Sequence, residues 1–238
     1  MATFVLVTGA WHGSWCWKRV REALMGRGHA VFTPTFTGIG ERSHLLSREV
    51  NLETHIADVM NLIRWEELKD VVLVGHSYGG LVVRSVADRM GDRIAALVYL
   101  DAFVPETGES LHDCLPPEQR EMQRDAAGDV VGEGWRVPPI PAAVFNVNEA
   151  DRAWVDAQCT VQPIACFQQK LSLERDGVPA GSIHYIWASD WEGSPFGQFY
   201  EKAKARGWST REFSCGHDVM LDRPEELTAA LLEIAAAT

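Results

Sequence analysis

The sequence predicts an α/β fold with a mainly parallel sheet of about six strands, covered by helices on both faces. Three observations lead to this prediction. Short apolar runs rich in β-branched residues alternate with helical patterns along most of the chain. The apolar runs contain few polar residues, which is typical of strands buried on both faces. The length of 238 residues suits one such domain with its own core.

The individual elements are expected where these patterns occur. The six predicted strands are Thr3–Thr8, Ala30–Thr33, Val71–Gly75, Ala95–Asp101, Ser182–Ala188 and Ser209–Ser214. The predicted helices between and after them are Ser14–Gly26, Leu52–Glu66, Gly79–Met90, Phe196–Arg206 and Pro224–Ala237. Glycines follow several of these helices, and a proline with two glutamates opens the last one, as helix ends require.

The alternation breaks once, between residues 104 and 181. This stretch has no clear strand, contains several Pro and Gly clusters, and has helical patterns at Glu118–Ala127 and Asn148–Gln158. So long an insertion is typical of a lid over the strand ends, where a site would need water excluded. We therefore expect a core of residues 1–103 and 182–238, with a helical cap at 104–181 inserted after the strand ending near Asp101.

The segment Gly75-His76-Ser77-Tyr78-Gly79 joins a predicted strand to a predicted helix. A Gly-x-Ser-x-Gly sequence at such a turn is the nucleophile elbow of α/β-hydrolases. The serine needs a strained backbone to expose its hydroxyl, and the flanking glycines let neighbouring chain segments approach closely. We therefore expect Ser77 to be the nucleophile.

A catalytic acid and a histidine should follow the serine in the chain, in that order. His217 lies after the last predicted strand and before the final helix, which is the expected place. Two acids compete for the remaining role. We favour Asp190, which follows the preceding strand, and Asp101 is the alternative because some α/β-hydrolases take the acid from that strand. Asp218 is too close to His217 in sequence to reach its imidazole from the required side.

The oxyanion of an acyl-transfer reaction needs two N–H donors. One should be the backbone N–H of Tyr78, directly after the nucleophile. The other should come from the loop after the first strand, where we choose Ala10 because Gly9 beside it permits close approach of a substrate. This loop has no Gly-x-Gly-x-x-Gly pattern, and we expect no dinucleotide, metal or other cofactor.

The chain resembles the small α/β-hydrolases related to bacterial esterases, plant methyl esterases and plant hydroxynitrile lyases. The resemblance covers nearly the whole chain and rests on four segments: 8–17 (TGAWHGSWCW), 75–80 (GHSYGG), 99–105 (YLDAFVP) and 216–220 (GHDVM). By position it supports Ser77, Asp190 and His217 as the triad, with Ala10 and Tyr78 as amide donors. It also implies a six-stranded core and a helical cap.

This sequence departs from that group at three positions. Members usually have His at the position of Thr8, and the lyase branch has Thr where Gly9 stands and Lys where Asp218 stands. A lysine there would stabilise departing cyanide, whereas an acidic residue would repel it. The departures at Gly9 and Asp218 disfavour lyase activity and favour hydrolysis.

Aromatic residues gather in the oxyanion loop, the expected cap and the strand-end loops. The sequence has nine tryptophans, and Trp11 and Phe103 flank the predicted carbonyl site. We therefore expect Trp11, Phe103 and Gly9 to contact the substrate. Further aromatic candidates for the pocket wall are Trp135, Phe145, Trp154 and Trp191.

The charge and the cysteines limit the partners and the compartment. A net charge of −11 argues against binding to nucleic acid or an anionic membrane. The chain has no signal peptide pattern and no long apolar run, and its five cysteines are scattered, so we expect a cytoplasmic protein. Its partner is a small-molecule ester, and the sequence leaves room for a homodimer.

Together the motifs predict a serine esterase that cleaves small to medium, apolar or aromatic carboxylic esters through an acyl-enzyme on Ser77. Two alternatives stay open. The same triad could hydrolyse lactones, amides or carbon–carbon bonds, or the fold could serve as a ligand-binding receptor with slow turnover.

Overall fold

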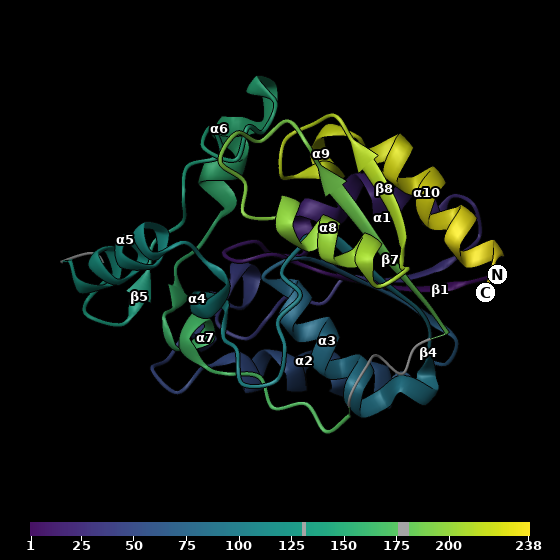
Figure 1. Cartoon of the computed structure of the whole chain (residues 1–238), viewed down its shortest axis with the longest axis horizontal. Helices are drawn as coiled ribbons and strands as arrows, with labels where there is room; N and C mark the ends of the chain where they lie inside the picture. The colour runs from purple at the N-terminus through teal and green to yellow at the C-terminus, as the bar shows by residue number, and fades with distance from the viewer. Residues whose placement is uncertain (130–131, 176–180) are drawn as a thin grey trace.

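The computed structural model describes residues 1–129, 132–175 and 181–238. Its centre is a sheet of six strands in the order β2-β1-β3-β4-β7-β8 (Figure 1). Every neighbouring pair in this sheet is parallel. The strands are β1 (Thr3–Val7), β2 (Ala30–Phe32), β3 (Val71–Ser77), β4 (Ile94–Ala102), β7 (Ser182–Ala188) and β8 (Ser209–Phe213). The six predicted strands are confirmed, with ends that differ by at most two residues.

Helices cover both faces of the sheet (Figure 1). On one face α1 packs against α10, and on the other α2 packs against α3. All seven residues of β3 are buried as a result, which explains its unbroken apolar sequence. The helices of the core are α1 (Lys18–Met25), α2 (Leu52–Trp65), α3 (Gly79–Met90), α8 (Gly197–Ala205), α9 (Val219–Asp222) and α10 (Pro224–Ala236), with 3-10 turns at Ser14–Trp17, Gly40–Leu45 and Gly91–Arg93.

The chain between β4 and β7 forms a group of short elements that projects from one end of the sheet (Figure 1). Two predicted helices are present there as α5 (Pro117–Gly128) and α6 (Glu149–Gln158). The strands β5 (Arg136–Val137) and β6 (Gln162–Pro163) pair antiparallel, and the helices α4 (Leu111–Cys114) and α7 (Ala165–Gln168) complete the group. These four elements are too short for a sequence pattern to indicate. Residues 130–131 and 176–180 of the expected cap lie outside the described residues.

The helix α6 is fixed to the core by an ion pair. Arg19 of α1 donates two hydrogen bonds, of 2.6 and 2.7 Å, to the two carboxylate oxygens of Asp151. The paired geometry holds the guanidinium and the carboxylate in one relative orientation. One side of the inserted segment is therefore anchored to the domain beneath it.

The ladder between β3 and β4 contains a bulge at the C-terminal ends of the two strands. His76 is opposite Leu100, but the next residue, Ser77, is opposite Ala102. Asp101 is thus an extra residue in β4, and its φ of +41° lies in the left-handed region. A bulge of this kind re-aims a side chain that would otherwise alternate with its neighbours.

The helix α3 lies very close to β4, and a glycine makes this approach feasible. A Cβ atom on Gly80 would come 2.1 Å from the carbonyl oxygen of Phe103 and 3.1 Å from the Cβ atom of Ala102. Neither the helix nor the strand end can yield easily, because both are buried. The contact at Gly80 therefore places the start of α3 beside the bulge at Asp101.

We expect Gly80→Ala to lower the free energy of unfolding by about 1–3 kcal/mol, because it overpacks this contact. Gly128→Ala is the matched control, since a Cβ there would meet no atom within 4 Å. It should leave the free energy of unfolding unchanged or raise it by up to about 1 kcal/mol. Urea unfolding of the three proteins measures both effects, and equal stabilities for the two variants would contradict this view of the contact.

Within the described part of the chain, no helix combines the length and the apolar character needed to cross a membrane.

Candidate active site

Ser77 stands at the turn between β3 and α3 with a φ of +53°. The flanking glycines are needed at this turn. A Cβ on Gly79 would lie 2.5 Å from the carbonyl oxygen of Thr8, and one on Gly75 would lie 2.4 Å from a methyl of Val83. The predicted strand, turn and helix are therefore present around the serine, in the strained form that exposes a side chain at the top of a sheet.

The imidazole of His217 is held by Asp101. Nδ1 of His217 lies 2.6 Å from Oδ2 of Asp101, and both side chains are buried. The other carboxylate oxygen of Asp101 accepts a hydrogen bond of 3.2 Å from the backbone N–H of Ala188, at the end of β7. The bulge in β4 is what turns Asp101 toward the histidine, because the extra residue takes it out of the normal alternation of the strand.

The expectation that Asp190 holds His217 is wrong for this geometry. Asp190 is exposed, and its loop is held by backbone atoms: its N–H donates to the carbonyl of Cys215, and its carbonyl accepts from the amide of Asn146. The end of the preceding strand contributes an N–H to Asp101 instead of a carboxylate to His217. The alternative that the sequence left open, Asp101, occupies the position.

Aromatic rings surround the His217 imidazole. The ring of Phe196 stacks on it with 5.0 Å between centroids and 8° between planes, and Trp191 and Phe145 lie 4.8 and 5.2 Å away. Burial lowers the pKa of His217, so the imidazole is neutral at pH 7 and able to accept a proton. Burial also raises the pKa of Asp101, and the Ala188 N–H opposes that rise by stabilising the carboxylate.

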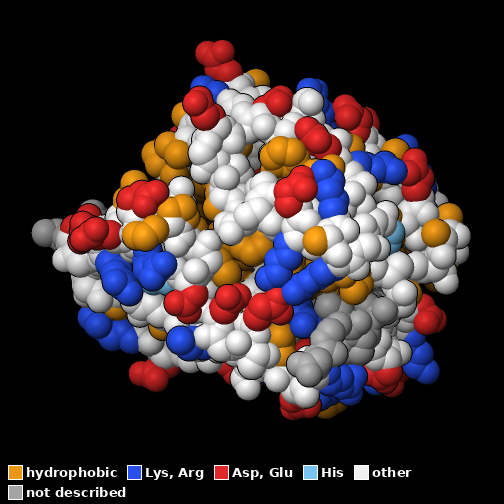
Figure 2. All heavy atoms as spheres, in the orientation of Figure 1, with side chains coloured by type: hydrophobic (Ala, Val, Ile, Leu, Met, Phe, Trp, Pro, Cys, Tyr) orange, Lys and Arg blue, Asp and Glu red, His pale blue; other side chains and the backbone are white. Residues whose placement is uncertain are grey.

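Ser77 and His217 open onto one cavity of about 400 Å³. Ala10 and Tyr78, the two predicted amide donors, line its floor beside them. The rest of the wall is almost entirely apolar, and much of it comes from the segment between β4 and β7. Hydrophobic side chains are visible in a hollow on the face shown in Figure 2. A serine, a neutral imidazole and the two residues predicted to supply amide donors thus line one apolar cavity, which is the set of groups that acyl transfer requires.

The aromatic residues expected at the pocket take several positions. Trp11, Phe103, Phe145 and Trp191 line the cavity. Gly9 lies beneath the site, where a Cβ would come 2.8 Å from the His76 ring and 3.0 Å from the Cβ of Ser77. The remaining two aromatics are in contact with other groups: Trp154 packs against Trp15, and Trp135 lies under the guanidinium groups of Arg48 and Arg136.

Trp11 joins the loop after β1 to the segment between β4 and β7. Its backbone N–H donates to the side chain of Gln162 at 2.9 Å, and its indole N–H donates to the carbonyl of Val137 at 3.0 Å. Its own carbonyl accepts from the N–H of Thr160 at 3.1 Å. Three hydrogen bonds therefore connect this one residue to the elements at β5 and β6.

A cluster of charged and polar side chains lies under the site, and the sequence reasoning did not identify it. Nε2 of His12 is 3.2 Å from Oδ2 of Asp218, and Nε2 of His76 is 3.8 Å from Oδ1 of the same carboxylate. The His76 ring also lies 4.4 Å from the ring of His217. All four side chains are buried. The only available signal was the position of His12 in the oxyanion loop, which carries no information about a partner more than 200 residues away.

The attraction between His12 and Asp218 shifts the pKa values of both groups in the direction that keeps both charged. Burial alone would lower the pKa of His12, but the negative charge of Asp218 raises it well above the usual value. Burial alone would raise the pKa of Asp218, but His12, with His76 and His217, holds it below the usual value. Asp218 therefore faces the histidines under the site and does not line the cavity, so the expected repulsion of cyanide by this carboxylate is not supported by its position.

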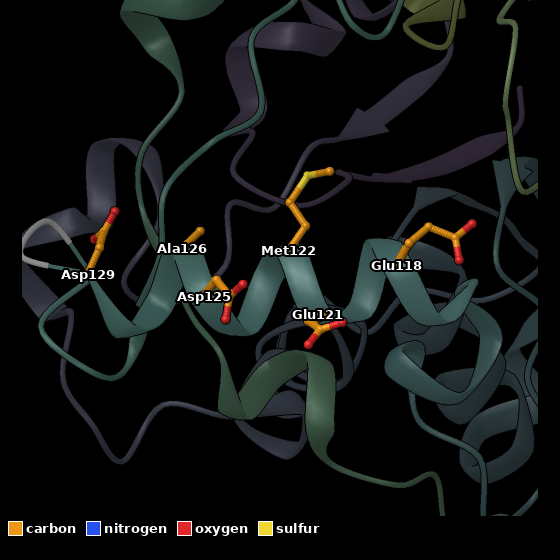
Figure 3. A pocket seen from close by; sticks show the side chains of 6 residues that line it. All are labelled: Glu118, Glu121, Met122, Asp125, Ala126 and Asp129. Carbon is orange, nitrogen blue, oxygen red and sulfur yellow. The ribbon is translucent and has the colours of Figure 1, made fainter.

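A second, shallow depression runs along α5 and is of a different kind (Figure 3). Its charged residues are Glu118, Glu121, Asp125 and Asp129. Met122 and Ala126 line both this depression and the apolar cavity, so α5 borders the two of them. Among the described residues, no group of three or more His, Cys, Asp or Glu side chains is arranged to hold a metal ion.

Comparison with known proteins places this fold and site in a family. The family model for the alpha/beta hydrolase family matches residues 4–231. The chain is 46% identical to a carbendazim hydrolyzing esterase of Nocardioides sp. (strain SG-4G), over 97% of this chain and 98% of that protein. It is 32% identical to methylesterase 7 of Arabidopsis thaliana, over 98% and 95% of the two chains.

Solved structures agree in fold. An extracellular alpha/beta-hydrolase from a Paenibacillus species superposes with a TM-score of 0.85 at 22% identity, covering 98% of this chain and 99% of that one. Tomato methylketone synthase I superposes with a TM-score of 0.80 at 18% identity, covering 99% and 98%. The chain belongs to the α/β-hydrolase family, and the predicted fold class is confirmed. The predicted class of enzyme, a carboxylic ester hydrolase, agrees with the names of the relatives.

The His12–Asp218 pair should make stability depend on pH. Folding raises the pKa of His12, so its contribution is complete below about pH 6.5 and is lost as the pH rises through the folded value. Folding lowers the pKa of Asp218, so its contribution is complete above about pH 4 and is lost as the pH falls further. The pair therefore stabilises the protein most between these limits.

We expect the stability difference between wild type and His12→Gln to be largest near pH 5.5 and to narrow toward pH 9. Each unit by which folding raises the pKa of His12 corresponds to about 1.4 kcal/mol of this narrowing. Urea unfolding of both proteins at pH 5.5, 7.5 and 9 measures it. A difference that is constant or grows with pH would show that His12 is not held as a cation.

Proposed function

We propose that this protein is a serine esterase that hydrolyses small to medium, apolar or aromatic carboxylic esters through an acyl-enzyme on Ser77. The observation that carries the proposal is the opening of Ser77 and His217 onto one apolar cavity, with Asp101 fixed behind the imidazole. The family match and the esterase names of its relatives support the same reaction.

The reaction follows from the protonation states. The neutral imidazole of His217 accepts the Ser77 proton at Nε2 as the hydroxyl oxygen attacks the ester carbonyl. Nδ1–H of the same ring donates to Asp101, which keeps the ring in this tautomer and stabilises the imidazolium that forms. The imidazolium then returns the proton to the departing alcohol, and water attacks the acyl-enzyme by the same steps in reverse.

The negative charge on the carbonyl oxygen needs donors that are in position before the reaction. We assign this role to the backbone N–H groups of Ala10 and Tyr78, both of which border the cavity beside Ser77. Tyr78 directly precedes α3, so the N-terminal end of that helix adds a favourable field at the same point.

The composition of the cavity wall favours a flat apolar group on the substrate. Trp11 and Phe103, which we propose as substrate contacts, stand on the wall with Phe145, Trp191 and Phe196. Gly9 would act indirectly, by allowing the oxyanion loop to lie against Ser77. We further propose that residues 104–181 act as a cap over a core of 1–103 and 182–238, because that segment supplies much of this wall.

A second candidate substrate class is the aromatic carbamate. The relative that is 46% identical over nearly the whole chain is named for hydrolysis of carbendazim, which is a methyl carbamate on a flat heteroaromatic ring. A carbamate, like an ester, offers a serine nucleophile an acyl carbonyl with an alkoxide leaving group, and the aromatic wall suits the ring.

We also propose that the protein acts in the cytoplasm on a free small molecule. All five cysteines are free thiols, and three of them are buried, which suits a reducing compartment.

Replacement of the nucleophile tests the function. We expect Ser77→Ala to lower the turnover of p-nitrophenyl acetate, butyrate and benzoate by at least about 10³-fold, because the acyl-enzyme can no longer form. Release of p-nitrophenol measures turnover, and loss of carbendazim followed by chromatography tests the carbamate candidate with the same two proteins. Equal rates for wild type and Ser77→Ala would refute the proposal.

The two aspartates provide a matched test of the acid. Asp101→Asn should lower kcat by about 10⁴-fold, because the amide favours the wrong tautomer of His217. Asp190→Asn removes the same charge from an exposed loop and should leave kcat within a few fold of wild type. Loss of activity in the Asp190 variant alone would mean that His217 pairs with Asp190 during catalysis.

A further inference from the structure

The peptide between Ala10 and Trp11 is held at both ends. Its carbonyl oxygen lies 2.7 Å from Nδ1 of His12, and its N–H donates to Oε1 of Gln162 at 2.9 Å. Trp11 follows with a φ of +64°, a conformation that a large side chain adopts only when its surroundings impose it. The orientation of this peptide is therefore fixed by two side chains, one from the next residue in the chain, His12, and one from a distant segment, Gln162.

The bonds of His12 define its protonation state. Nδ1 faces a carbonyl oxygen and Nε2 faces the carboxylate of Asp218, and both of these groups accept hydrogen bonds. Each ring nitrogen must therefore carry a proton, which makes His12 an imidazolium. The other titratable groups facing it are Cys159, whose sulfur is 3.9 Å from both nitrogens, and the rings of His76 and His217. Asp218 is the group that balances the charge.

We propose that His12, held by Asp218, is a positioning residue that fixes the Ala10–Trp11 peptide and thereby aims the Ala10 N–H at the oxyanion. This inference rests on the proposed function, because it assumes that Ala10 is an oxyanion donor. The carbonyl that His12 binds and the N–H that would contact the oxyanion belong to the same residue. Holding the carbonyl thus limits rotation about the Ala10 backbone, which would otherwise turn the N–H away.

His12 itself does not line the cavity, and it reaches the site only through Ala10. Its effect should therefore appear in the transition state more than in substrate binding. Loss of an oxyanion contact lowers kcat while KM changes little, and a misplacement of about 1 Å is enough to cost on the order of 10²-fold. Gln162, at the other end of the same peptide, should act in the same way.

Two replacements of His12 separate positioning from a structural role. The amide nitrogen of an asparagine lies near the place of Nδ1, so His12→Asn keeps a donor for the Ala10 carbonyl and loses contact with Asp218. The amide of a glutamine reaches the place of Nε2, so His12→Gln keeps a donor for Asp218 and loses the Ala10 carbonyl. If His12 only stabilised the fold, the asparagine variant would be the more damaged one, because it leaves Asp218 buried without a donor.

Positioning predicts the opposite order. With p-nitrophenyl butyrate, His12→Gln should lose on the order of 10²-fold in kcat with KM within about twofold, whereas His12→Asn should stay within about tenfold of wild type. Inhibition by an aryl trifluoromethyl ketone, whose adduct with Ser77 bears the oxyanion, should weaken in parallel with the loss of kcat/KM. Equal losses, no loss or the reverse order would overturn the proposal. Circular dichroism establishes that each variant is folded in the assay.

Gln162→Leu provides an independent variant if His12→Asn does not fold. It removes the acceptor for the Trp11 N–H without touching the charged cluster, and it should lower kcat with little change in KM. Wild-type kcat in Gln162→Leu would overturn the proposal. Ser77→Ala distinguishes a failure of the proposed function from a failure of the proposed role of His12. Full activity of Ser77→Ala would refute the esterase. An inactive Ser77→Ala together with a fully active His12→Gln would refute only the role of His12.

Discussion

The extra residue in β4 determines the geometry of the whole site. Asp101 has no partner in the ladder with β3, and its backbone is in the left-handed region at the same height as the strained turn of Ser77. The bulge directs the carboxylate toward His217, and the backbone N–H of Ala188 at the end of the next strand fixes it there. The serine and the acid thus come from the ends of the neighbouring strands β3 and β4, and the histidine comes from the loop after β8. The close packing of α3 on β4 at Gly80 keeps the ends of β3 and β4 at one level.

The site contains two buried pairs, each made of one histidine and one carboxylate. In one, Asp101 holds the neutral ring of His217, and in the other, Asp218 holds the charged ring of His12. The ring of His76 lies between them, and burial, followed by the influence of His217, lowers its pKa so that it remains uncharged. Each carboxylate therefore has its own imidazole, which explains why adjacent residues 217 and 218 serve different pairs. Removal of one partner would leave a buried charge without compensation, which is costly in a low-dielectric interior.

Most of the fold and half of the site could be predicted from the sequence. Strands buried on both faces produce unbroken apolar runs, and the elbow around Ser77 and the location of His217 follow from local patterns. The acid could not be identified correctly in this way, because a one-residue bulge leaves no mark on hydrophobic periodicity and Asp190, after the next strand, fitted the usual order better. The His12–Asp218 pair was missed for a similar reason, since it connects loops that only the folded sheet brings together. The short strands β5 and β6 are also set by tertiary contacts alone.

The three hydrogen bonds of Trp11 have a consequence for how such a protein can diversify. Residues that shape the apolar wall and residues that hold the loop after β1 belong to the same segment between β4 and β7, joined through this one tryptophan. A replacement near Gln162 or Val137 that enlarges the cavity also disturbs the backbone beside Ala10. New substrate ranges should therefore arise more readily from replacements on α4 and α5, which border the cavity and make none of these three hydrogen bonds. Residues on α4 and α5 can vary with little effect on the rate, whereas changes among the hydrogen-bond partners of Trp11 alter selectivity and rate together.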